Sequence, residues 1–104
     1  LVVPPPWHAE RVLFVGDAVH TTTPHSAFGA GLAIEDAVVL GELAASALPF
    51  DDLAAALTAR RYERTRLVVE TSLQLSRWEQ EPGRPNPAAG RLIGETMAAL
   101  AAPI

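Results

Sequence analysis

The feature that most constrains the fold of this chain is an apolar run at residues 12–15, Val-Leu-Phe-Val, which is followed by Gly16 and Asp17. A short run of β-branched and aromatic residues ended by glycine predicts a strand buried on both faces, as in a parallel or mixed sheet. One such strand cannot form a sheet alone. The chain opens on Leu1 rather than Met and meets three prolines before the run, so its start resembles the interior of a longer chain.

Composition limits the classes of function. The chain has 104 residues, enough for one small domain, and 49% of them are apolar with a net charge of −4, which indicates a globular protein without a basic surface for nucleic acid. The absence of cysteine excludes disulfides and thiolate metal sites. No apolar stretch approaches the roughly eighteen residues of a membrane span, and no signal-peptide pattern precedes residue 12. We therefore expect a cytoplasmic protein with no membrane partner.

Helical patterns follow the strand. A loop containing Pro24 leads to a predicted helix at residues 29–48, which Pro49 ends. Small residues recur along this helix at intervals of three and four, namely Ala30, Ala33, Ala37, Gly41 and Ala44. Such a stripe lets a helix lie close to a sheet or a flat ligand, while Leu32, Val39 and Leu43 provide ordinary packing.

A second, long helix is predicted at residues 53–78, with Asp51 or Asp52 as its N-cap. Its apolar stripe is interrupted at residues 60–66, Arg-Arg-Tyr-Glu-Arg-Thr-Arg. Surface base rates favour a solvated face there; the alternative is that these arginines join the helix to another domain. A Pro/Gly-rich loop at 81–90 and a short helix within 91–102 complete the pattern.

The residues suited to ligand chemistry lie between Gly16 and Asp36. Asp17 directly follows the predicted strand, which places its carboxylate at the carboxyl edge of the sheet, where open α/β folds bind ligands. A carboxylate there suits the vicinal hydroxyls of a ribose or ribitol. The alternative is an ordinary Gly-Asp turn.

The helix start carries the second candidate feature. Gly29, Ala30 and Gly31 open the helix with small side chains, so its free amides and the positive end of its dipole are open to an anionic or carbonyl-rich ligand. Glycines also occur in helix starts that bind nothing. The combination of Asp17 with this helix start favours a ligand site.

Other chemistries are disfavoured. His20 and His25 with Asp17 lack a third ligand at metal-site spacing, and Ser26 lacks the nucleophile-elbow pattern of hydrolases. The adjacent Glu35 and Asp36 project about 100° apart on a helix. We therefore expect a salt bridge on the helix surface or between domains rather than an acid/base pair. No metal site and no catalytic residue is assigned.

Residues 11–40 resemble the second FAD-binding motif of the FAD-dependent aromatic hydroxylases, the single-component flavoprotein monooxygenases, and in particular their salicylate-hydroxylase-like branch. The matching positions are Gly16, Asp17, Ala18, Val19, His20, Pro24, Gly29, Glu35, Asp36 and Ala37. Trp7 and residues 62–66 are similar to the carboxyl-terminal part of the family. Two positions depart from the pattern: Val19 replaces alanine, and Ala27 stands where glycine is frequent, so the loop is expected to differ locally.

The resemblance implies a fold class that is mostly α with one or two strands. The chain would be the C-terminal fragment of an α/β (α+β) FAD-binding fold of the p-hydroxybenzoate-hydroxylase type. Residues 1–48 would form the second half of the FAD-binding domain, with strand, Gly-Asp turn and helix, and residues 49–104 a C-terminal helical segment.

The resemblance also implies the cofactor contacts. Asp17 would bind the ribitol hydroxyls of FAD, the amides of Ala30 and Gly31 would face the pyrimidine edge of the isoalloxazine, and Pro24 would border the flavin and substrate pocket. Gly16 and Gly29 belong to the same cofactor-binding set.

The implied reaction is hydroxylation of a small aromatic substrate with NAD(P)H and O₂. No G-x-G-x-x-G motif, second Asp-Gly motif or substrate sheet is present, so the missing N-terminal Rossmann and substrate portion would be the partner, and the chain alone is expected to be inactive. Two alternatives stay open: a same-fold flavin epoxidase or oxidoreductase, and a non-catalytic helical interaction module.

Overall fold

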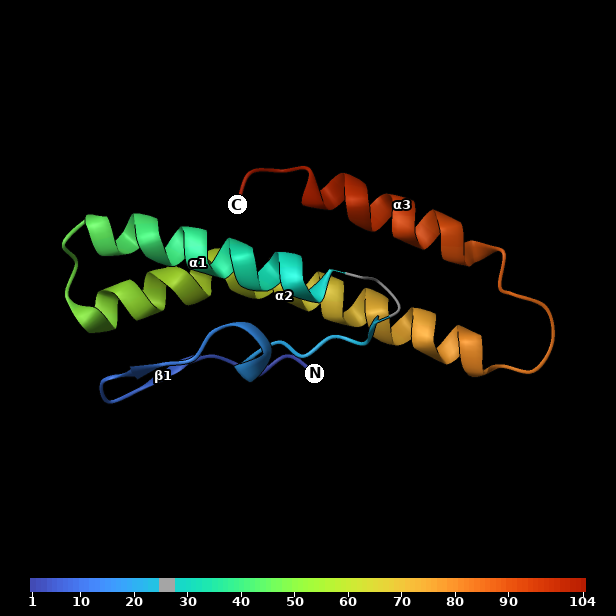
Figure 1. Cartoon of the computed structure of the whole chain (residues 1–104), viewed down its shortest axis with the longest axis horizontal. Helices are drawn as coiled ribbons and strands as arrows, with labels where there is room; N and C mark the ends of the chain where they lie inside the picture. Colours follow the sequence, from blue (N-terminus) through green and yellow to red (C-terminus); the bar gives the residue numbers. More distant parts are fainter. Residues whose placement is uncertain (25–27) are drawn as a thin grey trace.

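The computed structural model describes residues 1–24 and 28–104 (Figure 1). A hairpin of β1 (His8–Ala9) and β2 (Val12–Leu13) leads into a 3-10 turn, η1 (Gly16–Ala18). Three helices follow, α1 (Gly29–Ala45), α2 (Phe50–Gln80) and α3 (Ala88–Leu100). The described part is therefore mostly helical with one two-stranded sheet, as the sequence predicts.

The helices form an elongated array with α2 as its spine. The described part measures 53 × 25 × 17 Å, and α2 alone would span about 46 Å at the usual helical rise. In Figure 1, α1 lies along the N-terminal half of α2, and α3 lies along its C-terminal half. Short connections join α1 to the start of α2 and the end of α2 to α3, which favours antiparallel packing.

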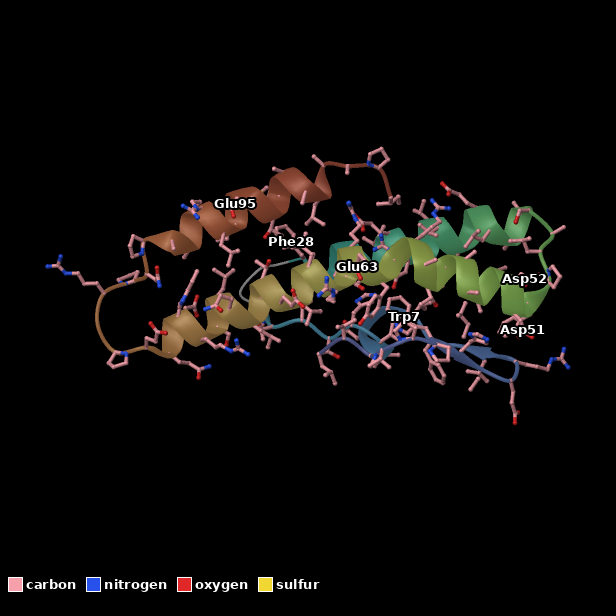
Figure 2. All side chains as sticks on the ribbon, turned by 180° about the vertical axis from the view of Figure 1, so that it is seen from behind. Trp7, Phe28, Asp51, Asp52, Glu63 and Glu95 are labelled. Atoms are coloured by element: carbon pink, nitrogen blue, oxygen red, sulfur yellow. The ribbon has the colours of Figure 1, made fainter. Side chains whose placement is uncertain are left out.

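The core is small and lies between α1, α2 and the N-terminal segment. Its buried apolar side chains are Trp7, Val19, Leu32, Val39, Ala54, Leu57, Val68, Val69 and Leu75. The Trp7 indole N–H donates a hydrogen bond to the Val3 carbonyl (2.8 Å), and the ring contacts those of His20 and Tyr62. Figure 2 shows Trp7 between the N-terminal segment and α2. The packing roles predicted for Leu32 and Val39 are confirmed.

The connection between α1 and α2 corrects two predictions. Helix α1 ends at Ala45 rather than residue 48, because Ala47 adopts a left-handed φ of 57° and the position before Pro49 disfavours helical backbone. Asp51 and Asp52 do not cap α2; its N-cap is Pro49, which makes no side-chain cap. The two aspartates lie in the first turn (Figure 2), where their negative charge interacts favourably with the positive end of the helix dipole.

The prediction of a strand buried on both faces is wrong for the chain as described. Strand β2 covers only two residues and pairs antiparallel with β1. Val12, Phe14 and Val15 are 54%, 42% and 37% exposed. The physical reason is that β1 is the only strand paired with β2 in the part that the structure describes, so these side chains are only partly covered.

Most of the small-residue stripe of α1 is likewise left uncovered by the described residues. Ala30, Ala37, Gly41 and Ala44 are exposed, and Ala33 is half-buried. Helix α1 instead turns Leu32, Asp36 and Val39 toward α2. The packed face thus includes a carboxylate.

Helix α3 begins three residues before the predicted segment and packs on α2. A buried hydrogen bond joins the hydroxyls of Thr71 and Thr96 (2.9 Å). At the end of α3, the Arg64 guanidinium donates to the carbonyls of Leu100, the last residue of the helix (2.7 Å), and of Ala102 (3.0 Å). Among the described helices, none has the length and hydrophobicity needed to cross a membrane.

Candidate functional site

The Gly16–Asp17 turn is built on a conformation that favours glycine. Gly16 is buried with a φ of +62°, and its carbonyl accepts hydrogen bonds from the amides of Val19 and His20, both at 3.0 Å. A side chain at Gly16 would be strained by this φ. Asp17 lies on the outside of the turn, exposed, and its carboxylate is paired with none of the described residues. The turn therefore presents a carboxylate to the surroundings.

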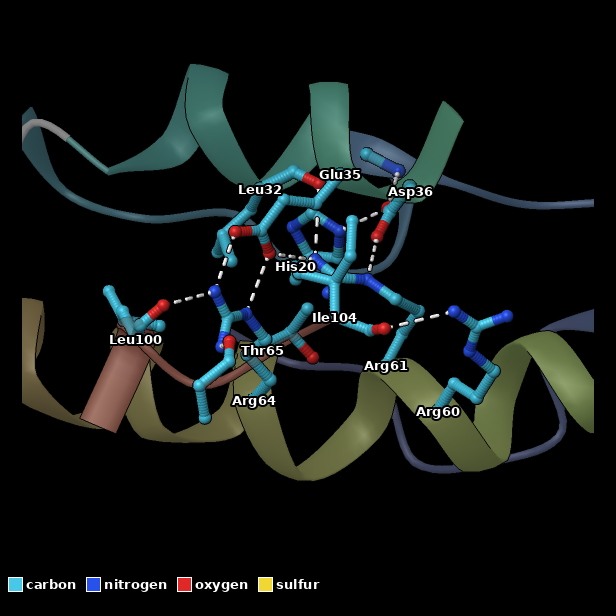
Figure 3. Close-up of polar contacts among 12 residues, drawn as sticks. His20, Leu32, Glu35, Asp36, Arg60, Arg61, Arg64, Thr65, Leu100 and Ile104 are labelled. Atoms are coloured by element: carbon cyan, nitrogen blue, oxygen red, sulfur yellow. Dashed lines mark hydrogen bonds and ion pairs between the residues drawn. The ribbon is translucent and has the colours of Figure 1, made fainter. Parts of the chain in front are cut away.

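The carboxylate of Asp36, on α1, binds both ends of this turn through hydrogen bonds. One oxygen, Oδ2, accepts the Gly16 amide (2.9 Å) and the His20 ring nitrogen Nε2 (2.6 Å). The other, Oδ1, accepts Arg61 Nε from α2 (2.7 Å). Asp36, His20 and Arg61 are each at most 1% exposed. Figure 3 shows the side chains converging between α1 and α2.

Asp36 is ionised in this setting. Burial by itself raises the pKa of Asp36, but the hydrogen bonds from His20, Arg61 and the Gly16 amide outweigh it and hold that pKa below its usual range. Because a carboxylate only accepts, His20 must donate through Nε2. His20 Nδ1 has no partner among the described residues.

Glu35 adds a second carboxylate to the same junction. It accepts Arg61 Nη2 (2.7 Å) and two nitrogens of Arg64 (both 2.8 Å). Burial by itself raises the pKa of Glu35. The hydrogen bonds from Arg64 and Arg61 and the charges of these two arginines outweigh that effect, so the pKa of Glu35 lies below its usual range. Two carboxylates and two guanidiniums therefore balance each other in charge.

These contacts correct the interpretation of residues 60–66 as a solvated face. Arg61 is fully buried and Arg64 is largely covered, whereas Arg66 is exposed and pairs with Glu63 and Glu70 of its own helix. Arg61 and Arg64 join α2 to α1 and to the segment after α3, within the same chain. The predicted salt bridge of Glu35 and Asp36 is confirmed, but it lies in the buried junction rather than on the surface.

Among residues 1–24 and 28–104, no side chain caps the start of α1. Its N-cap, Phe28, makes no side-chain cap, so the amides of the first turn lack intrahelical partners. Ala30 and Gly31 are exposed, and a Cβ at Gly31 would meet nothing within 4 Å. At Gly29 a side chain does not fit, because an added Cβ would lie 2.5 Å from Thr22 Oγ1.

The turn packs against the N-terminal half of α1. An added Cβ at Gly16 would be 3.6 Å from Ala33 Cβ, one helical turn beyond Gly29 and Ala30. The loop after the turn is tied to α2, because Thr23 bonds to Ser72 through its amide (3.4 Å) and hydroxyl (3.1 Å). Pro24 follows, exposed. The arrangement offers a carboxylate for hydroxyl groups and amides for an electron-rich edge, a donor and acceptor set that fits a flavin.

Some predicted residues lie elsewhere. His25, Ser26 and Ala27 are outside the described residues. Within residues 1–24 and 28–104, no group of three or more His, Asp or Glu side chains is placed to hold a metal ion. His20 bonds to Asp36 instead.

Sequence reasoning missed the partnership of His20, Asp36 and Arg61. A signal was present, since Arg61 follows Leu57 by four residues and precedes Val68 by seven, on the stripe that α2 buries. A single arginine on an otherwise buried stripe is as consistent with a buried ion pair as with a break in the buried face of the helix.

Known proteins match this chain across most of its length. Residues 2–74 match the family described as FAD binding domain. The chain is 38% identical over 102 residues to "Putative FAD-dependent monooxygenase YetM" of Bacillus subtilis, covering 96% of this chain and 26% of that protein. It is 40% identical over 95 residues to 3-hydroxybenzoate 6-hydroxylase 2 of Aquipseudomonas alcaligenes, covering 89% and 28%. For FAD-dependent monooxygenase ptmM of Penicillium ochrochloron the identity is 34% over 95 residues, covering 82% and 22%.

The chain thus spans about a quarter of the length of these relatives. No solved structure matches it significantly. The match over residues 2–74 includes the Gly16–Asp17 turn, the whole of α1 and most of α2. The chain therefore belongs to the FAD-binding domain family of the FAD-dependent monooxygenases, and the cofactor of that family is FAD.

Proposed function

We propose that this chain is the C-terminal part of a longer FAD-dependent monooxygenase that hydroxylates an aromatic substrate with NAD(P)H and O₂. Two findings support this: the chain spans about a quarter of its relatives, and one of them is named a hydroxybenzoate hydroxylase. When bound, FAD supplies the redox and oxygen-transfer chemistry. The chain supplies part of the surface that holds the cofactor.

The observation that carries the proposal is the exposed Asp17 carboxylate on a turn that packs against the N-terminal half of α1, a helix whose start no described side chain caps. Asp17 would accept hydrogen bonds from the ribitol hydroxyls of FAD. The amides of Ala30 and Gly31 would donate to the pyrimidine edge of the isoalloxazine, where they and the helix dipole would favour negative charge. Gly16 allows the left-handed backbone of the turn, and Gly29 allows close packing against Thr22. Pro24 would border the flavin and substrate pocket.

The remainder of the longer protein supplies the Rossmann half and the substrate portion. Residues 1–48 then complete the FAD-binding domain, and residues 49–104 form the helical segment behind it. The exposed Val12, Phe14 and Val15 suit the face of a larger sheet. By this proposal the chain alone has no hydroxylase activity.

The test begins with the DNA upstream of the Leu1 codon. An in-frame strand followed by G-x-G-x-x-G supports the proposal, while a stop codon with a nearby start overturns it. The longer protein is then assayed for aromatic-dependent NAD(P)H oxidation and for the product formed. An epoxide or a dehydrogenated product indicates a same-fold flavin enzyme, and a stable fold without flavin affinity indicates an interaction module.

A further inference from the structure

We infer that Asp36 is a positioning residue that fixes the Gly16–Asp17 turn relative to the start of α1, with His20 and Arg61 as its partners. Asp36 is 1% exposed, so it acts through the turn that it binds. Its link to the flavin rests on the function proposed above, whereas its effect on the turn does not.

One oxygen of Asp36 holds both ends of the turn. Gly16 and His20 begin and end the segment that carries Asp17, and the His20 amide closes it onto the Gly16 carbonyl (3.0 Å). Both residues then donate to Asp36 Oδ2, at 2.9 Å and 2.6 Å. Asp36 lies on α1 about two turns beyond Gly29. This oxygen therefore fixes the position of Asp17 relative to the first amides of α1.

Arg61 fixes the orientation of the carboxylate. Its Nε donates to Asp36 Oδ1 (2.7 Å), and its Nη2 donates to the Leu32 carbonyl (3.3 Å) one turn earlier on α1. With Oδ1 held from α2, Oδ2 is directed at the turn. Asp36 and Arg61 are at most 1% exposed, so bulk water cannot replace a lost partner.

The site requires a carboxylate. An asparagine at position 36 has one accepting oxygen and one donating NH₂, so whichever way it points, its NH₂ faces a donor: Gly16 and His20 on one side, or Arg61 Nε on the other. Stability alone does not explain a buried ion pair here, because apolar residues of similar volume stabilise such a junction at least as well. The polar arrangement is explained by the turn that it holds.

The first test measures amide hydrogen exchange by NMR in the full chain. In Asp36→Asn, we expect the amides of Gly16 and His20 to exchange at least about tenfold faster relative to the buried Leu57 amide, which reports global opening. The matched control is Glu35→Gln, which removes the neighbouring carboxylate and another contact of Arg61 but leaves the turn untouched. In this control the ratio should be unchanged. Equal acceleration at Gly16 and Leu57 in Asp36→Asn would overturn the inference.

A second variant covers the case in which Asp36→Asn does not fold. In Asp36→Asn/Arg61→Gln, the Gln side-chain oxygen occupies the chain position of Arg Nε and can accept the asparagine NH₂, so the asparagine oxygen can face Gly16 again. We expect exchange at Gly16 to return to within about threefold of the wild-type ratio. A folded double variant with an unprotected Gly16 amide would contradict the role of Asp36.

The third readout separates the inference from the proposed function. In the longer flavoprotein, Asp36→Asn should raise the Kd for FAD about tenfold and shift the visible flavin spectrum, with recovery in the double variant, while Glu35→Gln should leave both unchanged. If the wild-type protein binds no FAD, the proposed function fails, and the exchange result alone decides whether Asp36 holds the turn. If FAD binds equally well to Asp36→Asn, positioning toward the flavin is wrong.

Discussion

The junction between α1 and α2 and the surface formed by the hairpin and α1 have opposite characters. The junction buries Asp36, His20 and Arg61 at no more than 1% exposure, and each makes at least one hydrogen bond. The surface leaves Phe14 and Ile34 at 42% and 66% exposure. The charged groups have their partners within the chain, whereas the apolar side chains do not. Exposed apolar surface is typical of interaction sites, which supports a longer protein around this segment.

The largest effect is expected from removing Arg61. Arg61→Met leaves Asp36 as a buried carboxylate without its guanidinium partner, and breaking such a pair costs about 3–5 kcal/mol of unfolding free energy. Urea unfolding followed by circular dichroism measures this loss. Arg66→Met, on an exposed arginine of the same helix, should change the free energy by no more than about 0.5 kcal/mol. Similar losses for the two variants would show that the junction does not stabilise the fold.

The turn gives the next effect. Gly16→Ala places a Cβ on a residue with φ of +62° but in ordinary contact with Ala33, so we expect a loss of about 1–2 kcal/mol from the backbone alone. The matched control is Gly90→Ala in α3, where a Cβ meets nothing within 4 Å, and helix propensity predicts a gain of up to about 1 kcal/mol. The melting temperatures should therefore move in opposite directions. A neutral Gly16→Ala would mean that the turn adopts another backbone conformation.

Acid should weaken the junction before it affects the apolar core. The pKa values of Asp36 and Glu35 lie below their usual ranges in the folded chain, so their contribution to stability is fully present above the unfolded values of about 4. It is lost as the pH falls from there through the lower folded pKa values. We expect the free energy of unfolding to fall with pH in this window, and the slope to be shallower in Asp36→Asn. An identical slope in that variant would assign the acid sensitivity to other groups.

The smallest effect is expected on the exposed surface. Phe14→Ser should change the unfolding free energy of the chain by no more than about 1 kcal/mol, because Phe14 is 42% exposed and only part of its apolar surface leaves water on folding. Leu57→Ala, in the core, should cost about 2–5 kcal/mol. In the longer protein, where Phe14 is proposed to lie on the face of a larger sheet, Phe14→Ser should lower the free energy of unfolding by more than it does in this chain alone. A large loss in the chain alone would mean that Phe14 already belongs to its core.

Much of the fold could be predicted from local patterns. The three helices follow from apolar periodicity and from Pro49 and the loop at 81–90, although α1 ends earlier than predicted because Ala47 is left-handed. The buried strand could not be predicted correctly, because burial of residues 12–15 depends on neighbouring strands and not on the run itself. The sequence pattern identifies two parts of the candidate site, Asp17 and the start of α1. Their roles in binding stay predictions.

The sequence by itself determined the helices, the Gly-Asp turn and the family, because each depends on residues close together in the chain. Only the tertiary structure decided which charges are buried. Gly16, His20 and Arg61 reach Asp36 from 16 to 25 residues away, and no local pattern specifies such a meeting. The position of Arg61 on the buried stripe of α2 indicates that its side chain is covered, but which carboxylate it binds is decided only when α1 packs against α2.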